Sequence, residues 1–353
     1  ALLVRVLVDD DGALHARGGR HADADDDDDG DDDDDDDDDV EPEDCAEHGG
    51  ESRASLVQIH LVDGTYELFR CFFGAPPSTS PEGREVGAVR GLCATLLSLL
   101  RDDKTTHVAV AFDTVIESFR NELFGGYKTG AGIDPNLWAQ FPLAEAATKA
   151  LGITTWSMIE FEADDAIAAF ASRAAKDERV DRVLLCSPDK DLCQCVVDDR
   201  VVLFDRRRDL ILGDREVREK FGVPPNAIAD LLALVGDDAD GIPGIPGWGM
   251  KSAGAALTAY GHVEDTPDSA AHWKVKIRGA TNLAESLQAH RKEVALYKVL
   301  ATLRSDVPLK ESVDDIAWRG PDDEKLRVLA DVIGDKKLVE RASAVADKKL
   351  RAT

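Results

Sequence analysis

The stretch Val57-Gln-Ile-His-Leu-Val-Asp63 joins a short apolar run to a carboxylate at its end. Three later apolar runs, at residues 107–112, 154–159 and 182–187, are also followed by acidic residues. Between these runs lie segments with helical spacing of apolar residues, at 86–100, 137–151 and 163–175. Strands that alternate with helices predict an α/β fold, with a mostly parallel sheet flanked by helices on both faces.

The acidic residues that follow the strands are expected at one edge of this sheet. The carboxyl ends of parallel strands meet there, and open α/β sheets bind their ligands in that crevice. Each acidic residue alone has a structural alternative, because carboxylates also cap helices. Together they form a larger set: Asp63, Asp113, Glu162, Asp164, Asp165, Asp189 and Asp191.

Closely packed carboxylates repel one another, so they must either take up protons or bind cations. An all-oxygen set without His or Cys suits hard ions such as Mg²⁺ or Mn²⁺. More carboxylates than one Mg²⁺ uses favour a two-metal site for phosphodiester cleavage, with the ions about 3.5–4 Å apart. Arg120 and Lys128 follow Asp113, and helical spacing would turn both toward one phosphate groove. The alternative for these two residues is an ordinary solvated basic face.

After about residue 200 the pattern changes. Residues 201–204 and 210–212 flank three consecutive arginines and predict a hairpin. Helices are expected beyond it, at residues 214–221, 226–235, 250–260 and 282–303, with two more near the end. We therefore divide the chain near residue 212, into a sheet-based domain over residues 56–212 and a helical domain over residues 213–353.

A segment rich in Gly and Pro connects two of these helices and reads Gly236-Asp-Asp-Ala-Asp-Gly-Ile-Pro-Gly-Ile-Pro-Gly-Trp-Gly-Met-Lys-Ser252. Its glycines and prolines make the connection tight and let another backbone approach closely. The free N–H groups of the helix that opens at Met250 form an anion site, to which Lys251 and Ser252 add. The segment is interpreted as a hairpin that grips a DNA phosphate without reading bases. An ordinary helix–helix turn is the alternative.

The 353 residues include 42 Lys and Arg and 70 Asp and Glu, for a net charge of −28. Residues 1–55 hold 23 of the acidic residues against four arginines, and residues 23–39 are almost pure aspartate. Such a segment has few apolar residues to bury, so residues 1–55 are expected to form an acidic disordered extension. The remaining net charge of −9 argues only weakly against a nucleic-acid partner, because local basic patches bind where net charge does not.

Six cysteines occur without a C-x-x-C pair, at positions 45, 71, 93, 186, 193 and 195. This usage fits a reducing cytoplasm, which is the expected location. No apolar run reaches the ~18 residues that span a membrane, so no membrane partner is expected. The apolar start, residues 1–8, lacks the basic region and the cleavage site of a signal peptide.

In combination, the motifs resemble those of the 5′-3′ exonuclease and flap endonuclease family, which includes the N-terminal nuclease domain of bacterial DNA polymerase I. The resemblance covers residues 56–310 approximately. Each motif is weak singly, and their order makes the combination specific. They are His60-Leu-Val-Asp-Gly64, Ala111-Phe-Asp113, Phe119-Arg120, Tyr127-Lys128, Glu162-Ala-Asp-Asp165, Asp189-Lys-Asp191 and the run from Gly236-Asp237 to Lys251.

The resemblance implies a PIN-like nuclease domain followed by a helix-two-turn-helix DNA-binding domain. It also implies Mg²⁺-dependent cleavage of 5′-flapped or nicked duplex DNA, with Mn²⁺ as a substitute ion. The ligands of the first ion would be Asp63, Asp113, Glu162 and Asp164. Those around the second ion would be Asp165, Asp189, Asp191 and Asp240, with Asp237 as a supporting carboxylate.

The resemblance further implies contacts with the nucleic acid. Arg120 and Lys128 would steer the scissile phosphate, and Arg70 would contact a phosphate beside the first motif. The duplex-binding turn would hold K⁺ through backbone oxygens, and its residues are Gly247, Gly249, Lys251 and Ser252.

Three features differ from the family pattern, and one is the acidic extension over residues 1–55, for which the family offers no counterpart. Gly241 follows Asp240 where the family often has Asn, and residues 129–132 follow the Tyr-Lys pair where the family commonly has an Arg. The leading interpretation is a free-standing, monomeric 5′ nuclease that acts on duplex DNA with a 5′ flap, nick or overhang. One alternative is a catalytically weak DNA-junction-binding protein, which divalent-dependent turnover would separate from the nuclease. The other is an RNA-directed nuclease of the same sheet type, against which the duplex-gripping hairpin argues.

Overall fold

The computed structural model describes residues 57–351 of the chain. The acidic extension predicted over residues 1–55 lies outside these described residues, so the structure does not test that prediction. Among the described helices, none combines the length and the apolar character needed to cross a bilayer.

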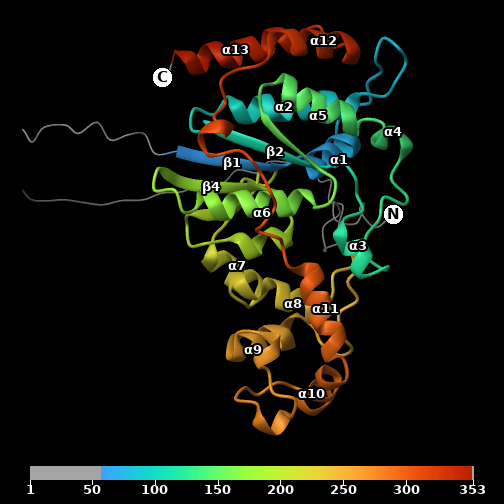
Figure 1. Cartoon of the computed structure of the whole chain (residues 1–353), viewed down its shortest axis with the longest axis vertical. Coiled ribbons are helices and arrows are strands. Elements are labelled where there is room, and N and C mark those ends of the chain that lie inside the picture. The colour runs from blue at the N-terminus through green and yellow to red at the C-terminus, as the bar shows by residue number, and fades with distance from the viewer. Residues whose placement is uncertain (1–56, 352–353) are drawn as a thin grey trace, which may run out of the picture. The chain divides into compact units, whose positions relative to one another are not determined.

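The described strands form a six-stranded sheet in the order β3-β2-β1-β4-β5-β6 (Figure 1). The pairings from β1 to β5 are parallel, and β6 pairs antiparallel with β5. The structure thus confirms the predicted, mostly parallel sheet and the hairpin predicted from residues 201–204 and 210–212. The strand order reverses beside β1, which opens a crevice at the carboxyl ends of the strands. The strands are β1 (Val57–Asp63), β2 (His107–Asp113), β3 (Thr154–Met158), β4 (Val180–Cys186), β5 (Val201–Asp205) and β6 (Leu210–Leu212).

Alternate side chains of the strands enter two different apolar clusters. Ile59 and Leu61 of β1 belong to the cluster that includes α6, whereas Val62 belongs to the cluster of α1 and α2. A period of two places consecutive side chains on opposite faces of a sheet. Helices therefore cover both faces, as predicted. Their bounds are α1 (Gly64–Gly74), α2 (Gly87–Leu100) and α6 (Ala163–Ala174).

The segment between β2 and β3 differs from the prediction. The helix expected over residues 137–151 is two helices, α4 (Pro135–Trp138) and α5 (Phe141–Ala150). Proline is favoured in the first turn of a helix, and Pro142 starts α5 in this way. The short helix α3 (Phe119–Leu123) was not predicted, and neither was α1.

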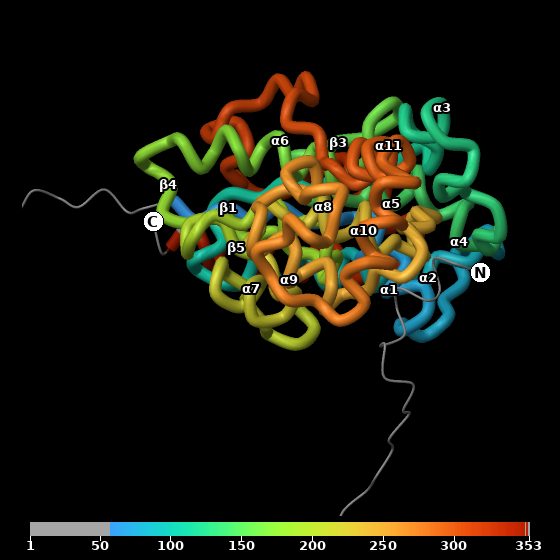
Figure 2. Tube along the Cα trace, turned by 90° about the horizontal axis from the view of Figure 1, so that it is seen from below, coloured from blue at the N-terminus to red at the C-terminus, as the bar shows by residue number. Residues whose placement is uncertain are grey.

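The helices of the second half lie below the sheet in Figure 1, and Figure 2 views them from below. There α8 packs against both α9 and α11. The helix expected over residues 282–303 is divided at His290, whose backbone is not helical (φ −117°, ψ 22°). The helices are α7 (Asp214–Phe221), α8 (Ile228–Val235), α9 (Met250–Tyr260), α10 (Ala280–Ala289) and α11 (Arg291–Ala301). Short 3₁₀ helices are η2 (Lys190–Cys195), η3 (Pro225–Ala227), η4 (Val263–Asp265), η5 (Ala270–His272) and η6 (Asp314–Ile316).

The last two helices, α12 (Asp323–Ile333) and α13 (Leu338–Leu350), return to the sheet. Leu326 of α12 and Ala342 of α13 belong to the apolar cluster of α2 and α5. Figure 1 shows both helices above the sheet, on the opposite side from α10. The end of the predicted helical domain thus packs on the sheet-based half, while the division near residue 212 stays a prediction.

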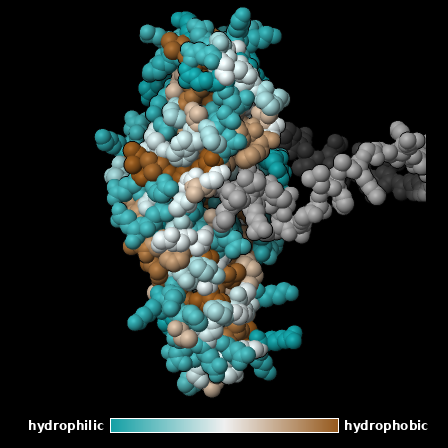
Figure 3. Space-filling view, turned by 90° about the vertical axis from the view of Figure 1, so that its right-hand side faces the viewer, coloured by the Kyte–Doolittle hydropathy of each residue, from teal (hydrophilic) through white to brown (hydrophobic). Residues whose placement is uncertain are grey.

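The large apolar side chains on the surface are dispersed over several elements. Phe73 of α1, Leu123 of α3 and Val328 of α12 are among the exposed ones. Figure 3 shows one face, on which separate apolar areas alternate with hydrophilic ones. Dispersed apolar side chains are normal for a protein surface and do not by themselves mark a binding site.

Candidate active site

Asp63 lies at the carboxyl end of β1, beside the reversal of strand order. Its Oδ1 accepts a hydrogen bond from the backbone N–H of Tyr66 (2.8 Å), so Asp63 also caps α1. Its Oδ2 accepts one from Ser187 Oγ (3.1 Å), just beyond the end of β4. A Cβ at Gly64 would lie 2.6 Å from the Phe112 ring, which explains the glycine after Asp63.

Asp113 and Glu162 reach the same edge from the next two strands. Asp113 ends β2, and its Oδ1 accepts a hydrogen bond from the backbone N–H of Ala163 (2.8 Å). Glu162 has an extended backbone (φ −92°, ψ 162°) and lies before α6 as its N-cap. Two residues that are two positions apart within a helix point in different directions. Glu162 precedes the helix, so this rule does not apply to it, and its side chain need not point away from that of Asp164.

Burial and neighbouring negative charges raise the pKa values of Asp63, Asp113 and Asp164. Burial raises the pKa of Asp63 to about 7, and the charges of Asp113 and Asp189 add to the rise. Burial also raises the pKa of Asp113, although Lys128 opposes the shift. The pKa of Asp164 rises well above its usual range through burial and through Asp63 and Asp189. Its Oδ1 is buried and has no hydrogen-bond partner among the described residues.

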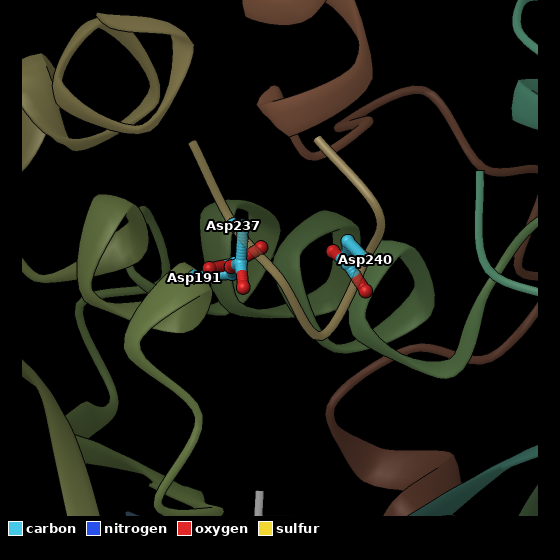
Figure 4. A group of neighbouring side chains, drawn as sticks. All are labelled: Asp191, Asp237 and Asp240. Atoms are coloured by element: carbon cyan, nitrogen blue, oxygen red, sulfur yellow. The ribbon is translucent and has the colours of Figure 1, made fainter. Parts of the chain in front are cut away.

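Asp191, Asp237 and Asp240 form a second acidic group, in which each offers an oxygen within 4.8 Å of the others (Figure 4). Asp191 belongs to η2 after β4, and the other two belong to the α8–α9 connection. Asp191 Oδ1 is buried without a hydrogen-bond partner in the described part of the chain. Burial and the charges of Asp189 and Asp240 raise the pKa of Asp191 well above its usual range. The pKa of Asp189 is raised too, again mainly by burial.

Lys128 connects the two halves of the site. Its Nζ lies 2.9 Å from Glu162 Oε2 and 2.9 Å from Asp240 Oδ1. Burial would lower the pKa of Lys128, but the charges of Asp240 and Glu162 outweigh it and hold the pKa well above its usual range. Burial would raise the pKa of Asp240, yet the charge and hydrogen bond of Lys128 lower it. The Tyr127 hydroxyl lies 3.3 Å from the same two carboxylates.

Several side chains that contact the carboxylates, Ser187 among them, were not predicted from the sequence. Besides Tyr127, Lys190 Nζ lies 2.7 Å from Asp237 Oδ2, and Ser118 Oγ donates a hydrogen bond to Glu162 Oε1 (2.6 Å). Lys190 stands between two predicted ligands in the sequence, which was a usable signal. Ser118 had no such signal, because it meets its partner only through the tertiary fold.

Arg120 occupies a place that differs from its prediction. Its side chain is 1% exposed and donates to both oxygens of Asp165, at 2.7 and 2.8 Å. It also donates to the backbone carbonyls of Leu300 (2.8 Å) and Thr302 (3.0 Å). The helical spacing that would turn Arg120 and Lys128 toward one groove is absent, because α3 ends at Leu123. A guanidinium enclosed in this way does not reach a DNA phosphate, so the predicted contact does not fit.

Asp165 belongs to the same enclosed cluster, in which Arg120 Nη1 also lies 3.2 Å from Glu162 Oε1. Besides Arg120, its oxygens accept hydrogen bonds from the backbone N–H groups of Glu162 (3.0 Å) and Arg304 (2.9 Å). One position along a helix turns the side chain by about 100°, so Asp165 faces this enclosed cluster while Asp164 faces the strand ends. Both oxygens of Asp165 are thus engaged by protein donors, and its predicted role as a metal ligand does not fit.

The α8–α9 connection is joined to the Lys128 segment by backbone contacts. The Lys128 N–H donates to the Asp240 carbonyl (3.0 Å). Gly241 has a positive φ of 73°, and a Cβ there would lie 2.3 Å from the Gly126 carbonyl oxygen. This explains a glycine where the family often has Asn, a residue that also tolerates the left-handed conformation.

The residues predicted to bind the duplex lie at the start of α9. Gly247 has a positive φ of 84°, and Gly249 is the N-cap of the helix. Ser252 Oγ accepts from the Gly249 N–H (3.0 Å), so this hydroxyl completes the cap. Lys251 is exposed beside the first-turn N–H groups, which have no acceptor within a helix.

Arg70 extends from α1 on the side of the sheet covered by α2. Its side chain is 31% exposed, and its guanidinium donates to Glu67 and to Thr95 Oγ1 (2.8 Å). Its contact with a DNA phosphate stays a prediction.

Comparison with known proteins identifies two consecutive matches. The 5′-3′ exonuclease N-terminal resolvase-like domain matches residues 58–222, and the 5′-3′ exonuclease C-terminal SAM fold matches residues 223–324. DNA polymerase I of Bacillus caldotenax is 36% identical over 288 residues, which are 80% of this chain and 32% of the polymerase. That of Rhizobium leguminosarum is 38% identical over 277 residues, 76% of this chain and 26% of the polymerase. The chain thus spans 32% and 26% of the length of these two curated relatives.

Solved structures share the fold. T5 5′-exonuclease with bound zinc ions has a TM-score of 0.56 at 19% identity, covering 83% of this chain and 98% of that chain. The catalytic core of Rad2 in complex with DNA substrate has a TM-score of 0.54 at 14% identity, covering 82% and 92%. The predicted order of a nuclease-type sheet domain and a helical domain is confirmed. By its two consecutive family matches and its fold, the chain belongs to the 5′-3′ exonuclease and flap endonuclease family.

Proposed function

We propose that the chain is a nuclease that hydrolyses phosphodiester bonds at 5′ flaps, nicks or overhangs of duplex DNA, with two divalent metal ions. The observation that supports it best is a pair of buried carboxylate oxygens, Asp164 Oδ1 and Asp191 Oδ1, that lack hydrogen-bond partners among the described residues. Buried polar atoms are normally paired, and a carboxylate without a donor is stabilised by a cation.

The donor set fits Mg²⁺ or Mn²⁺, because every donor is a carboxylate oxygen. Bound ions would neutralise the clustered charge, lower the pKa of the attacking water and stabilise the leaving oxygen. Two groups of residues would hold them, Asp63, Asp113, Glu162 and Asp164 on one side, and Asp189, Asp191, Asp237 and Asp240 on the other. The metal ions bound to T5 5′-exonuclease support cation binding in this fold. The K⁺ ion at the α8–α9 connection stays a prediction.

The chain's own cations prepare the site for a phosphate. Lys128 retains its proton at neutral pH because Asp240 and Glu162 hold its pKa high. It therefore offers a permanent positive charge to the scissile phosphate. Tyr127 stays protonated as well, since burial raises its pKa well above the usual range, and its hydroxyl orients Glu162 or Asp240.

The start of α9 would hold the duplex part of the substrate. Its N–H groups and Lys251 contact phosphate oxygens, which position a duplex without reading its sequence. The DNA bound to the Rad2 catalytic core supports a DNA substrate for this fold. The backbone link between Asp240 and Lys128 would then couple duplex binding to the site of cleavage.

The test is incubation of the protein with a 5′-labelled flap duplex, with Mg²⁺ or with excess EDTA. We expect short labelled products with Mg²⁺, and none with EDTA. The same sequence as a blunt duplex, a single strand and an RNA strand serves as control for structure and sugar selectivity. Full activity in EDTA would refute the metal mechanism, and cleavage of the RNA strand alone would refute the DNA substrate.

A further inference from the structure

A polar cavity of about 170 Å³ lies beside the acidic edge of the sheet. Its walls come from α1, from α2, from the residues after β4 and from the β5–β6 turn. The residues that matter are Tyr66, Arg70, Thr95, Ser187, Arg206 and Arg207. Neither the carboxylate site nor the α9 duplex contact uses the β5–β6 turn, so its arginines need a separate explanation.

One buried carboxylate, Glu67, organises two of the arginines. Arg70 donates to Glu67 Oε2 through Nε (2.9 Å) and Nη2 (2.5 Å), and Arg206 Nη1 lies 3.2 Å from Glu67 Oε1. Thr95 accepts from both, through its hydroxyl for Arg70 and its carbonyl for Arg206 (3.2 Å). Glu67 is 3% exposed, and its buried carboxylate fixes the positions of the Arg70 and Arg206 guanidiniums.

These contacts leave donors for a ligand. A guanidinium has five N–H donors. Within the described residues, Arg70 Nη1 and Arg206 Nε make no hydrogen bond to protein, and the exposed Arg207 side chain pairs with no carboxylate. The cavity holds three arginines against Glu67 and Asp205, so its formal charge is positive in a chain whose net charge is −28.

The size and position of the cavity select the ligand. Sites for drug-sized ligands occupy roughly 300–1,000 Å³, and one liquid water occupies roughly 30 Å³. A volume of about 170 Å³ lies below the range for drug-sized ligands and suits a small anion such as a phosphate group. Ser187 and Tyr66 line the cavity, and both also donate a hydrogen bond to Asp63. Ser187 donates through its hydroxyl, and Tyr66 through its backbone N–H. A strand cut at the acidic edge would thus present its neighbouring phosphate here.

We propose that Arg206 and Arg207 of the β5–β6 turn, together with Arg70, form a subsite for the backbone phosphate next to the scissile one. This inference rests on the proposed nuclease function. Fork-shaped guanidiniums bind phosphate oxygens with two hydrogen bonds, which suits a fixed register of the strand. The subsite positions the substrate strand and takes no part in bond breaking.

The experiment is single-turnover cleavage of a 5′-labelled flap duplex in which a neutral methylphosphonate replaces one phosphate at a time near the cut. For the natural chain, we expect one position adjacent to the cut to slow cleavage about tenfold, the loss typical of a charge-assisted hydrogen bond. Arg207→Ala should cleave the unmodified duplex more slowly and lose sensitivity to that position. Arg206→Gln should behave in the same way, and Arg207 is exposed, so its variant keeps the fold.

Arg208→Ala is the matched control, since Arg208 lies in the same turn but does not line the cavity. It should retain the sensitive position. The proposal is overturned if no position is sensitive, if the Arg207 variant keeps the sensitivity, or if the control loses it. Protection of the protein by inorganic phosphate without a sensitive position would assign the cavity to free phosphate. Absence of all DNA cleavage would refute the nuclease function itself, whereas cleavage without a sensitive position refutes only the subsite.

Discussion

The guanidinium of Arg120 donates to both carboxylate oxygens of Asp165, and both side chains are almost completely buried. The same guanidinium donates to the carbonyls of Leu300 and Thr302 at the end of α11. The pair therefore ties the start of α6 to the helical half of the chain. Its arrangement is that of a structural ion pair rather than of a phosphate contact.

The first prediction follows from this pair. Arg120→Ala removes the ion-pair partner of the buried Asp165 and leaves that charge only two backbone N–H donors, so we expect a loss of about 3–5 kcal/mol in the free energy of unfolding. Urea unfolding measures this loss. Arg179→Ala is the control. Arg179 donates two hydrogen bonds to Asp177 on the surface, so this substitution should change stability little. An Arg120 variant of normal stability that no longer cleaves DNA would restore the role of Arg120 at the phosphate.

The second prediction concerns pH and divalent ions. The pKa of Asp63 is about 7 in the folded state against 3.8 for a free side chain. Between these values the folded state binds more protons, so in EDTA the contribution of Asp63 to stability falls as pH rises from about 4 to 7. Mg²⁺ favours the ionised form and should raise the midpoint of thermal unfolding more at pH 8 than at pH 5. Asp63→Asn should weaken this pH dependence, and an Mg²⁺ effect that is equal at both pH values would contradict the prediction.

The third prediction separates chemistry from binding. Asp191→Asn removes a carboxylate from the group formed with Asp237 and Asp240. We expect cleavage to fall about 100-fold or more, since even residues that only support metal ligands cost 10–100-fold. DNA affinity should persist, because the change also removes a negative charge that repels phosphate. Asp189→Asn should behave alike, and Asp306→Asn on the surface should have normal activity. Normal cleavage by the Asp191 variant would show that the acidic group is not the site.

The fourth prediction concerns the duplex. Lys251→Ala should weaken binding of any duplex sequence and reduce the slope of log affinity against log salt by about one. Cleavage at saturating DNA should stay normal. Lys176→Ala is the control, because Lys176 is exposed after α6 and far along the chain from the α8–α9 connection. Fluorescence anisotropy over a salt series measures both variants, and equal slopes for Lys251→Ala and the natural chain would exclude the α9 contact.

The fifth prediction concerns residues 1–55, which carry 23 acidic residues and four arginines. Their charge should repel DNA or compete with it at low salt, and so slow association. The Debye length shrinks from about 30 Å at 0.01 M salt to about 8 Å at 0.15 M, so the effect should fade. A variant that begins at Ser55 should therefore bind a flap duplex faster at low salt, and stopped-flow rates should converge near physiological salt. Equal rates at the lowest salt would show that these residues do not affect binding.

Local patterns in the sequence were sufficient for the sheet and for the collection of carboxylates. The apolar run before Asp63, and the similar runs before Asp113 and Asp189, each contain the information for a buried strand. Parallel pairing then brings their ends together whatever the details of packing. Asp191, Asp237 and Asp240 were likewise identified by motif, and the structure brings them within 4.8 Å of one another.

The tertiary structure alone decided which charges face each other. In sequence, Asp164 and Asp165 are adjacent and look equivalent, yet Asp164 is buried where the charges of Asp63 and Asp189 raise its pKa. Asp165 meets Arg120, because the helical turn of about 100° per residue directs it to a guanidinium that arrives from α3. Arg70 and Arg206 share Glu67 as their ion-pair partner, and this contact also depends on elements far apart in the chain. Short-range spacing specifies strands, caps and helices, whereas the partner of a buried charge depends on long-range packing.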